Sequence, residues 1–134
     1  MKPITLLIVD DYKLIIKILS GILNNDPRFK VIGSCGTGEE GIIMAKELNP
    51  DIVLMDLELP GISGSEATEK ILSLCPHIKV LGLSSHTHPI YTYQMMRKGA
   101  MGYITKLASK KELFHALLEI KKGNKYTSFL PILN

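Results

Sequence analysis

The chain alternates between short apolar runs and longer segments with helical spacing, and this alternation constrains its fold more than any other feature. Five apolar runs begin at intervals of roughly 20 to 30 residues: Ile4–Val9, Lys30–Cys35, Asp51–Met55, Lys79–Leu83 and Gly102–Ile104. Repeated strand–helix units of this length predict a mainly parallel sheet with helices on both faces. The early runs are continuously apolar, as expected for strands that are buried on both sides.

The segments between the runs have the periodicity and the stop signals of helices. In Tyr12–Leu23, the apolar residues recur with a period of about 3.6, which is typical of a helix with one apolar face. Four later segments end at or close to a Pro or a Gly, which commonly terminate helices: Glu39–Leu48, Ser63–Leu74, Pro89–Lys98 and Lys110–Lys122. No clear element is predicted after residue 123. We therefore expect one domain over 1–122 and, over 123–134, a tail or the start of a linker.

Length and composition fit a single globular domain. The chain has 134 residues, of which 46% are apolar and 22% charged, so disordered and fibrous classes are excluded. Two cysteines, Cys35 and Cys75, are too few for a disulfide framework or a zinc site and suit a reduced, cytoplasmic protein. The first residues do not resemble a signal peptide, and no apolar stretch approaches the roughly 20 residues of a membrane span. A net charge of +3 does not by itself imply binding to nucleic acid.

Polar residues follow four of the five predicted strands. In an open parallel sheet, ligands bind beyond the carboxyl ends of the strands, where the strand order reverses. We therefore expect the following side chains to share one edge of the sheet: Asp10, Asp11, Asp56, Ser84, Ser85, Thr105 and Lys106. Taken singly, each residue also has a simpler interpretation. Asp11 and Asp56 suit helix or turn caps, the serines suit loops, and Lys106 suits the surface. A cap needs one acid, however, and here three are predicted to converge.

This set of residues suits phosphoryl transfer. Crowded carboxylates repel one another, and a hard divalent cation such as Mg²⁺ relieves the repulsion through oxygen ligands. A lysine and a serine hydroxyl can bind phosphoryl oxygens, and a carboxylate can itself be the nucleophile that forms an acyl phosphate. The glycines at 33, 36, 38 and 41 do not match a GxxxxGK[ST] loop, so ATP is poorly supported as a direct donor.

Four short pieces at these positions resemble the receiver domain of response regulators in two-component signalling. They are LLIVDD (6–11), DIVLMDLELPGISG (51–64), VLGLSSH (80–86) and GAMGYITK (99–106), and the resemblance covers roughly residues 4–122. It implies an α/β, doubly wound, flavodoxin-like fold. Five parallel strands in the order 2-1-3-4-5 would be flanked by five helices.

The resemblance also implies a role for each of the acidic positions. Asp56 matches the aspartate that receives the phosphoryl group. Asp10 and Asp11 match the acidic pair that holds Mg²⁺, for which Mn²⁺ can substitute. The backbone carbonyl of Glu58 matches a further ligand, so the metal set is Asp10, Asp11, Asp56 and Glu58.

The remaining matched positions concern the phosphoryl group and its release. Ser84 matches the switch hydroxyl that bonds the phosphoryl group, and Lys106 matches the lysine that pairs with it. Tyr103 matches the switch aromatic, which turns as Ser84 moves. Glu58 and His86 each lie two residues past a site residue, so we expect them to tune the lifetime of the phosphate; two exposed loop side chains are the alternative.

One position departs from the common pattern of the family. Many receivers have Pro after the lysine, whereas this chain has Leu107. A cis bond there would cost about 3–4 kcal/mol, so a cis peptide is not assumed, and the sequence leaves the isomer open. Receivers joined to DNA-binding domains of the NarL/FixJ type often lack that Pro, and GAMGYITK with GNKYTS (123–128) resembles them. The chain is therefore interpreted either as a single-domain receiver or as the regulatory half of a helix-turn-helix transcription regulator.

The expected function is that of a cytoplasmic phosphoacceptor. A sensor histidine kinase would phosphorylate Asp56, and the chain would turn over no separate substrate. Tyr and Met residues in Pro89–Lys98 suit a partner surface, which allows a homodimer on phosphorylation; neither nucleic acid nor membrane is an expected partner of this segment. Two alternatives remain: a degenerate receiver that only binds other proteins, and a phosphatase that uses Asp56 as its nucleophile.

Overall fold

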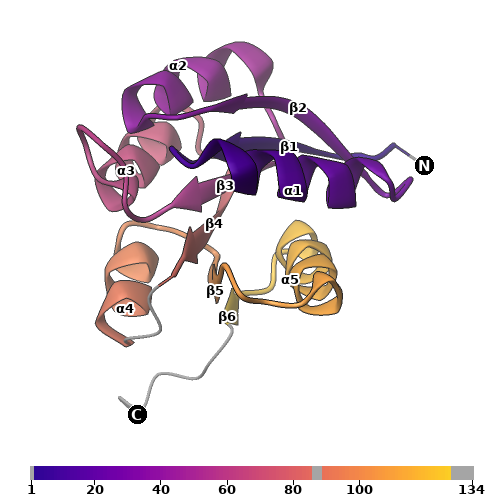
Figure 1. Ribbon diagram of the computed structural model, residues 1–134. Helices are drawn as coiled ribbons and strands as arrows, with labels where there is room; N and C mark the ends of the chain where they lie inside the picture. Colours follow the sequence, from indigo (N-terminus) through magenta and orange to yellow (C-terminus); the bar gives the residue numbers. More distant parts are fainter. Residues whose placement is uncertain (1, 86–88, 128–134) are drawn as a thin grey trace.

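The computed structural model describes residues 2–85 and 89–127 and shows alternating strands and helices (Figure 1). The elements in chain order are β1 Ile4–Val9, α1 Lys13–Asn24, β2 Phe29–Cys35, α2 Gly38–Leu48, β3 Ile52–Asp56, α3 Gly64–Leu74, β4 Lys79–Ser84, α4 Pro89–Arg97, β5 Gly102–Thr105, α5 Lys110–Lys122 and β6 Tyr126–Thr127. Both ends of each predicted element lie within one residue of the observed bounds. Among the described residues, no helix is both long enough and apolar enough to cross a bilayer.

The strands form one parallel sheet in the order β2-β1-β3-β4-β5-β6. The predicted order 2-1-3-4-5 is confirmed, and a sixth strand extends it at the β5 edge. This strand was not predicted, because two residues are too few to show a periodic pattern. Its identity as a strand depends on pairing with β5, which is a long-range contact.

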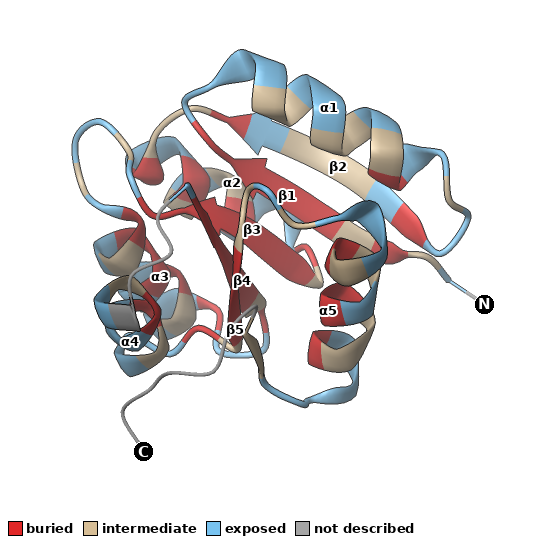
Figure 2. Cartoon of the chain, turned by 60° about the horizontal axis from the view of Figure 1, so that its bottom comes forward, coloured by how far each residue is buried: buried red, intermediate tan, exposed pale blue. Residues whose placement is uncertain are grey.

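Each face of the sheet is covered by a separate apolar core (Figure 2). Side chains such as Leu6, Ile52 and Leu81 pack with α1 and α5 on one face. Their neighbours in sequence, such as Leu7 and Val53, pack with α2, α3 and α4 on the other. Alternate residues of one strand therefore enter different cores, which is why the central strands are apolar along their whole length.

Local signals in the sequence set most helix ends. The side chains of Thr37, Ser63 and Ser109 each accept a hydrogen bond from a backbone amide in the first turn of α2, α3 and α5. Gly123 ends α5 with φ of 99°, a left-handed conformation that glycine adopts without strain. These caps fix where each helix meets the loops at the two ends of the sheet.

Candidate functional site

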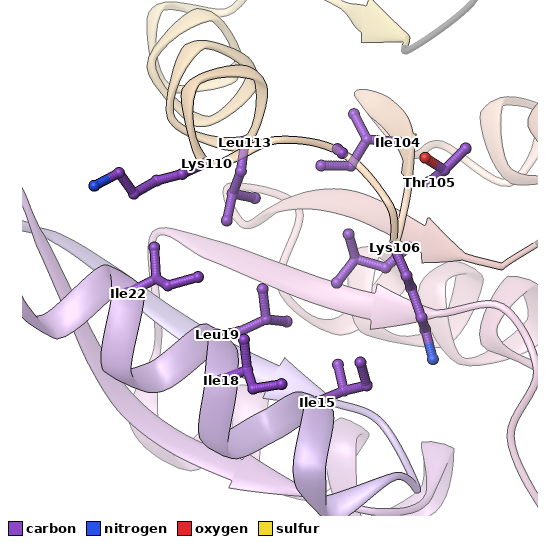
Figure 3. Close-up of a pocket in the computed structure, with 11 residues that line it drawn as sticks. Ile15, Ile18, Leu19, Ile22, Ile104, Thr105, Lys106, Lys110 and Leu113 are labelled. Atoms are coloured by element: carbon purple, nitrogen blue, oxygen red, sulfur yellow. The ribbon is translucent and has the colours of Figure 1, made fainter.

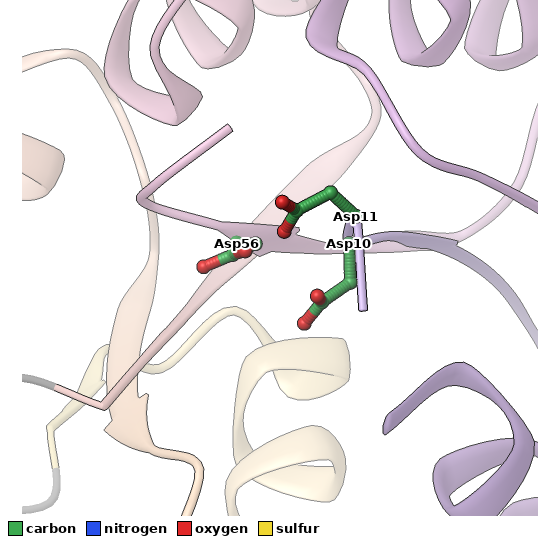
Figure 4. Close-up of side chains that lie close together, drawn as sticks. All are labelled: Asp10, Asp11 and Asp56. Carbon is green, nitrogen blue, oxygen red and sulfur yellow. The ribbon is translucent and has the colours of Figure 1, made fainter. Parts of the chain in front are cut away.

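Three acidic side chains meet where the strand order reverses between β1 and β3. The two strands pair along Leu6–Val9 and Ile52–Met55, so that Asp10 follows β1 beside Asp56 at the end of β3. One carboxylate oxygen each of Asp10, Asp11 and Asp56 lies within 4.8 Å of the other two, and the three side chains gather at this point (Figure 4). Asp10 and Asp56 are buried, with exposed fractions of 0% and 2%, whereas Asp11 is exposed. The expectation that these residues converge is therefore met.

Lys106, in the loop after β5, reaches the same cluster. Its Nζ atom lies 2.7 Å from Oδ2 of Asp10 and 3.3 Å from Oδ2 of Asp56. The backbone amide of Lys106 donates to the carbonyl of Ser84 at 2.8 Å, which ties this loop to the end of β4. No peptide bond in the described part of the chain is cis, so the Lys106–Leu107 bond, which the sequence left open, is trans.

The environment of Asp56 raises the pKa of its carboxyl group. Burial, together with the neighbouring Asp10 carboxylate, raises the pKa of Asp56 to about 6, although the ammonium of Lys106 opposes this shift. The pKa of Lys106 is raised: burial alone would lower it, but the charges of Asp10 and Asp56 outweigh that effect. Lys106 is therefore a fixed positive charge, and Asp56 is the acid whose protonation its surroundings control.

The oxygen atoms of the cluster fit a hard divalent cation. Asp10 Oδ1 accepts a hydrogen bond from the Tyr12 amide at 2.8 Å. Asp10 Oδ2 is buried, and the ammonium of Lys106 lies 2.7 Å from it. A carboxylate oxygen has two lone pairs, so one remains available beside the two other carboxylates. An all-oxygen set with excess negative charge is the chemistry that Mg²⁺ prefers.

Glu58 lies close to the acidic cluster through its backbone. Its amide donates to Oδ1 of Asp56 at 3.2 Å, while its side chain is exposed. The nearby backbone is consistent with the predicted use of the Glu58 carbonyl as a ligand, which stays a prediction. His86, the other residue expected to tune the lifetime of the phosphate, lies outside the described residues.

Ser84 and Tyr103 form a buried hydroxyl pair behind the cluster. Both residues have an exposed fraction of 0%, and the Ser84 side chain lies within hydrogen-bonding reach of the Tyr103 hydroxyl. Burial raises the pKa of Tyr103, so its phenol is neutral at ordinary pH. Ser84 ends β4 directly beside Asp56, because Asp56 and Leu83 are opposite each other in the sheet. The pair thus connects the acidic cluster to β5.

A helix cap does not match the structure for either acid, but Asp56 does cap a turn, because its Oδ1 accepts a hydrogen bond from the Glu58 amide at 3.2 Å. The N-cap residue of α1 is Tyr12, and no side chain caps that helix, so Asp11 is not a helix cap. The cap of α3 is Ser63, whose hydroxyl accepts from the Glu66 amide at 3.1 Å, so Asp56 has no capping role there.

Gly64 is a positioning residue that the sequence analysis did not single out. A Cβ atom at this position would lie 2.0 Å from the backbone oxygen of Asp56. The amide of Gly64 donates to the Leu57 carbonyl at 3.0 Å, which closes the loop between β3 and α3. The second glycine of the PGISG stretch was the signal in the sequence, since a position where two backbone segments approach closely accepts no larger residue.

An apolar pocket opens beside Lys106, between α1 and α5 (Figure 3). Its volume is about 100 Å³, and the apolar stripe predicted in the first helix lines it rather than the fully buried core. Ile15, Leu19 and Ile22 are half-buried there, and Ile18 is 47% exposed. Leu14 of the same stripe is 51% exposed. The stripe predicted the helix correctly, but α1 and α5 leave space between them that periodicity does not reveal.

Comparison with known proteins gives a consistent result. A family model described as the response regulator receiver domain matches residues 6–118. Response regulator GacA from Pseudomonas aeruginosa is 37% identical over 125 residues, which is 93% of this chain and 58% of GacA. The chain thus spans little more than half of that relative.

Two solved structures extend the comparison. A two-component response regulator of the LuxR family from Aurantimonas sp. SI85-9A1 has a TM-score of 0.90 at 28% identity, covering 94% of this chain and 90% of that one. The signal receiver domain of the response regulator NarL from Mycobacterium tuberculosis has a TM-score of 0.88 at 26% identity, covering 92% and 100%.

Proposed function

This chain belongs to the response regulator receiver domain family, with receivers of the NarL/FixJ type among its relatives, and we propose that Asp56 is the residue that receives the phosphoryl group. Receivers of this family take a phosphoryl group from a sensor histidine kinase. One observation supports the assignment: the carboxylate of Asp56, the residue that matches the family's phosphorylated aspartate, is buried at the strand-order reversal and lies beside both an acidic pair and Lys106.

The transfer begins with an ionised Asp56. With a pKa of about 6, this carboxyl is mostly deprotonated at neutral pH, so an oxygen lone pair is available for attack. The oxygen forms a bond to phosphorus while the P–N bond to the kinase histidine breaks, and the electron pair of that bond returns to the imidazole nitrogen. The product is an acyl phosphate on Asp56. Lys106, 3.3 Å from the carboxylate, holds a positive charge where the phosphoryl oxygens gather.

Asp10, Asp11 and Asp56, with the carbonyl of Glu58, would hold Mg²⁺, or Mn²⁺ in its place. When bound, the cation neutralises negative charge on the cluster and on the phosphoryl oxygens. The chain itself contributes the geometry: Tyr12 orients Asp10 through a 2.8 Å hydrogen bond from its amide, and Glu58 orients Asp56 in the same way at 3.2 Å.

Ser84 and Tyr103 respond to the new group. Phosphorylation adds strong acceptor oxygens beside the buried Ser84 hydroxyl, which can donate to one of them. The Tyr103 hydroxyl lies within hydrogen-bonding reach of Ser84, so a shift of Ser84 acts on the ring in β5. Glu58 and His86 would tune how fast water removes the phosphate, as proposed from their positions in the sequence.

The output of the protein is a further part of this proposal. The matched relatives include a transcriptional regulatory protein, DegU, and we infer that residues 1–122 act as the receiver of a cytoplasmic regulator of transcription. In that arrangement the receiver turns over no separate substrate, and its phosphorylation controls a partner surface or a homodimer. DNA binding would belong to another segment.

Phosphorylation by a small donor tests the assignment directly. Wild-type chain incubated with acetyl phosphate and Mg²⁺ should gain one phosphoryl group by intact mass, and Asp56→Asn should gain none. Asp51→Asn is the matched control, because Asp51 lies at the other end of β3 and should leave uptake unchanged. Uptake by Asp56→Asn at the wild-type level would refute the assignment.

Two results, one from this assay and one from a turnover assay on phosphate esters, would favour the rival functions. A wild-type chain that takes up no phosphate would be a degenerate receiver that acts only by binding other proteins. Repeated hydrolysis of phosphate esters by the wild-type chain, with no stable phosphorylated species, would favour a phosphatase.

A further inference from the structure

The short strand β6 lies along the free edge of β5, on the strand that carries Tyr103 (Figure 1). Tyr126 is opposite Gly102 and Thr127 is opposite Tyr103 in a parallel pairing. The Tyr126 amide donates to the carbonyl of Met101 at 3.1 Å. An uncovered β5 edge would present unpaired backbone groups, and β6 satisfies part of them.

Contacts with α5 hold this segment in place. The hydroxyl of Tyr126 donates to Oε2 of Glu112 at 3.0 Å, and its ring packs edge-on against His115. At the end of α5, the backbone amide of Asn124 donates to the carbonyl of Glu119 at 3.0 Å, and its side-chain amide donates to Oε1 of Glu119 at 3.3 Å. The segment after α5 is therefore fixed from two sides, by the helix and by the sheet.

Gly102 matches the presence of β6 on this edge. A Cβ atom at position 102 would lie 2.4 Å from the backbone oxygen of Tyr126. It would also lie 2.9 Å from Cδ1 of Ile120 and 3.0 Å from Cδ1 of Leu81. The backbone contact cannot yield as a flexible side chain can, so residue 102 must be small for β6 to dock.

A chain of contacts links β6 to Asp56. The backbone of Tyr103 is opposite Thr127, and its buried side chain, on the strand next to β4, lies within hydrogen-bonding reach of Ser84. Ser84 ends β4 beside Asp56, and its carbonyl accepts the 2.8 Å hydrogen bond from the Lys106 amide. Only two residues, Ser84 and Tyr103, therefore separate β6 from the site.

The hydroxyl group of Ser84 explains how a phosphoryl group on Asp56 would affect Tyr103. A serine hydroxyl has one donor and two acceptor sites, so Ser84 can donate to a phosphoryl oxygen and still accept from the Tyr103 hydroxyl. Hydrogen bonds in such a series strengthen one another. A phosphoryl group on Asp56 thus favours the buried position of Tyr103. A ring leaving that position would disturb β5 at the edge that β6 covers, so burial of Tyr103 and pairing of β6 favour each other.

We propose that β6 is an edge strand that senses phosphorylation: it pairs more tightly with β5 when Asp56 carries a phosphoryl group, and its pairing strengthens binding at the site. This inference rests on the proposed function of Asp56. Because such coupling is reciprocal, the factor by which the phosphoryl group stabilises β6 equals the factor by which β6 raises affinity for that group.

Amide hydrogen exchange on the intact chain tests the first half. Beryllofluoride with Mg²⁺ serves as a probe that mimics a phosphoryl group on a carboxylate. We expect protection of the Tyr126 amide to rise about 5-fold or more when the probe binds, a typical size for coupling between sites. Unchanged protection at Tyr126, with probe binding shown by calorimetry, would overturn the inference and leave the proposed function standing.

The affinity of a variant tests the second half. Tyr126→Pro removes the amide that donates to Met101, and Lys125→Ala, with an exposed side chain in the same segment, is the matched control. Tyr126→Pro should bind beryllofluoride more weakly by the factor seen in hydrogen exchange, and Lys125→Ala should match the wild type. Equal affinities of all three chains would overturn the inference. Failure of the wild type to bind the probe would overturn the proposed function and the inference with it.

Discussion

A lysine–aspartate ion pair lies at each end of β3 with the same separation, yet the pKa of the aspartate shifts in opposite directions at the two ends. At the carboxyl end, Lys106 Nζ lies 3.3 Å from Asp56, and at the amino end, Lys121 Nζ lies 3.3 Å from Asp51. The pKa of Asp56 is raised to about 6. The pKa of Asp51 is lowered: partial burial opposes the shift, but hydrogen bonds from Thr5 and the charge of Lys121 outweigh it.

Burial and the neighbouring charges explain this difference. The Asp56 side chain is only 3% exposed and faces the Asp10 carboxylate, whereas the Asp51 side chain is 35% exposed and receives two hydrogen bonds from Thr5. A lysine at 3.3 Å does not decide the state of an aspartate by itself. Asp51 stabilises the fold, while Asp56 sits where its charge is costly and, as proposed, chemically useful.

Replacing the two lysines should give the largest difference between the two ends of β3, in the rate of phosphorylation. Lys106→Ala removes the positive charge beside the phosphoryl group and leaves Asp10 and Asp56 facing each other. We expect its rate of phosphorylation by acetyl phosphate to fall about 100-fold at pH 7.5, the usual size for loss of one charge-stabilising group. Lys121→Ala, at the other end of the strand, should keep the wild-type rate. A rate for Lys106→Ala within 2-fold of the wild type would remove the distinction between the two ends.

The stability of the fold should change in opposite directions at the two ends. The folded pKa of Asp56 lies above its ordinary value, so its stabilising contribution is complete below about pH 4 and is lost as pH rises through about 6. Asp56→Asn should therefore stabilise the protein by about 2 kcal/mol at pH 8 and by little at pH 4. Urea unfolding at both pH values measures this difference.

Asp51→Asn is the counterpart in the same experiment. The pKa of Asp51 is lowered, so its contribution is present above about pH 4 and is lost as pH falls below that value. Because the pair with Lys121 is partly exposed and screened, we expect a loss of only about 0.5–1 kcal/mol at pH 8. Two variants that shift stability in the same direction would contradict the comparison.

The smallest effect concerns the approach of water to the phosphate. Glu58 is exposed next to Asp56, and the proposed ligand at this position is its backbone carbonyl. Glu58→Ala should change the dephosphorylation rate several-fold, on the order of 1 kcal/mol in activation free energy, and leave the affinity for Mg²⁺ intact. Glu47→Ala, in an exposed position on α2, is the control. Wild-type rates in both Glu58→Ala and His86→Ala would end the idea that these residues tune the lifetime.

Most of the fold was predictable because its signals are local. A continuous apolar run such as Ile4–Val9 marks a buried strand within six residues, and a serine such as Ser109 marks a helix start within four. The prediction failed for β6, whose two residues have no pattern of their own. It was incomplete for α1, whose apolar stripe lines a pocket beside α5 instead of lying fully in the core.

The sequence by itself determined which groups the proposed site contains, because it places acids, a hydroxyl and a lysine directly after separate strands, and parallel strands end at one edge. Only the tertiary structure decided how these groups act on one another. The raised pKa of Asp56, the ion pair between Lys106 and Asp10 and the contact of β6 with Gly102 all depend on residues that are distant in the chain. Burial and charge act through space, so their effect is set by packing and not by any local stretch of sequence.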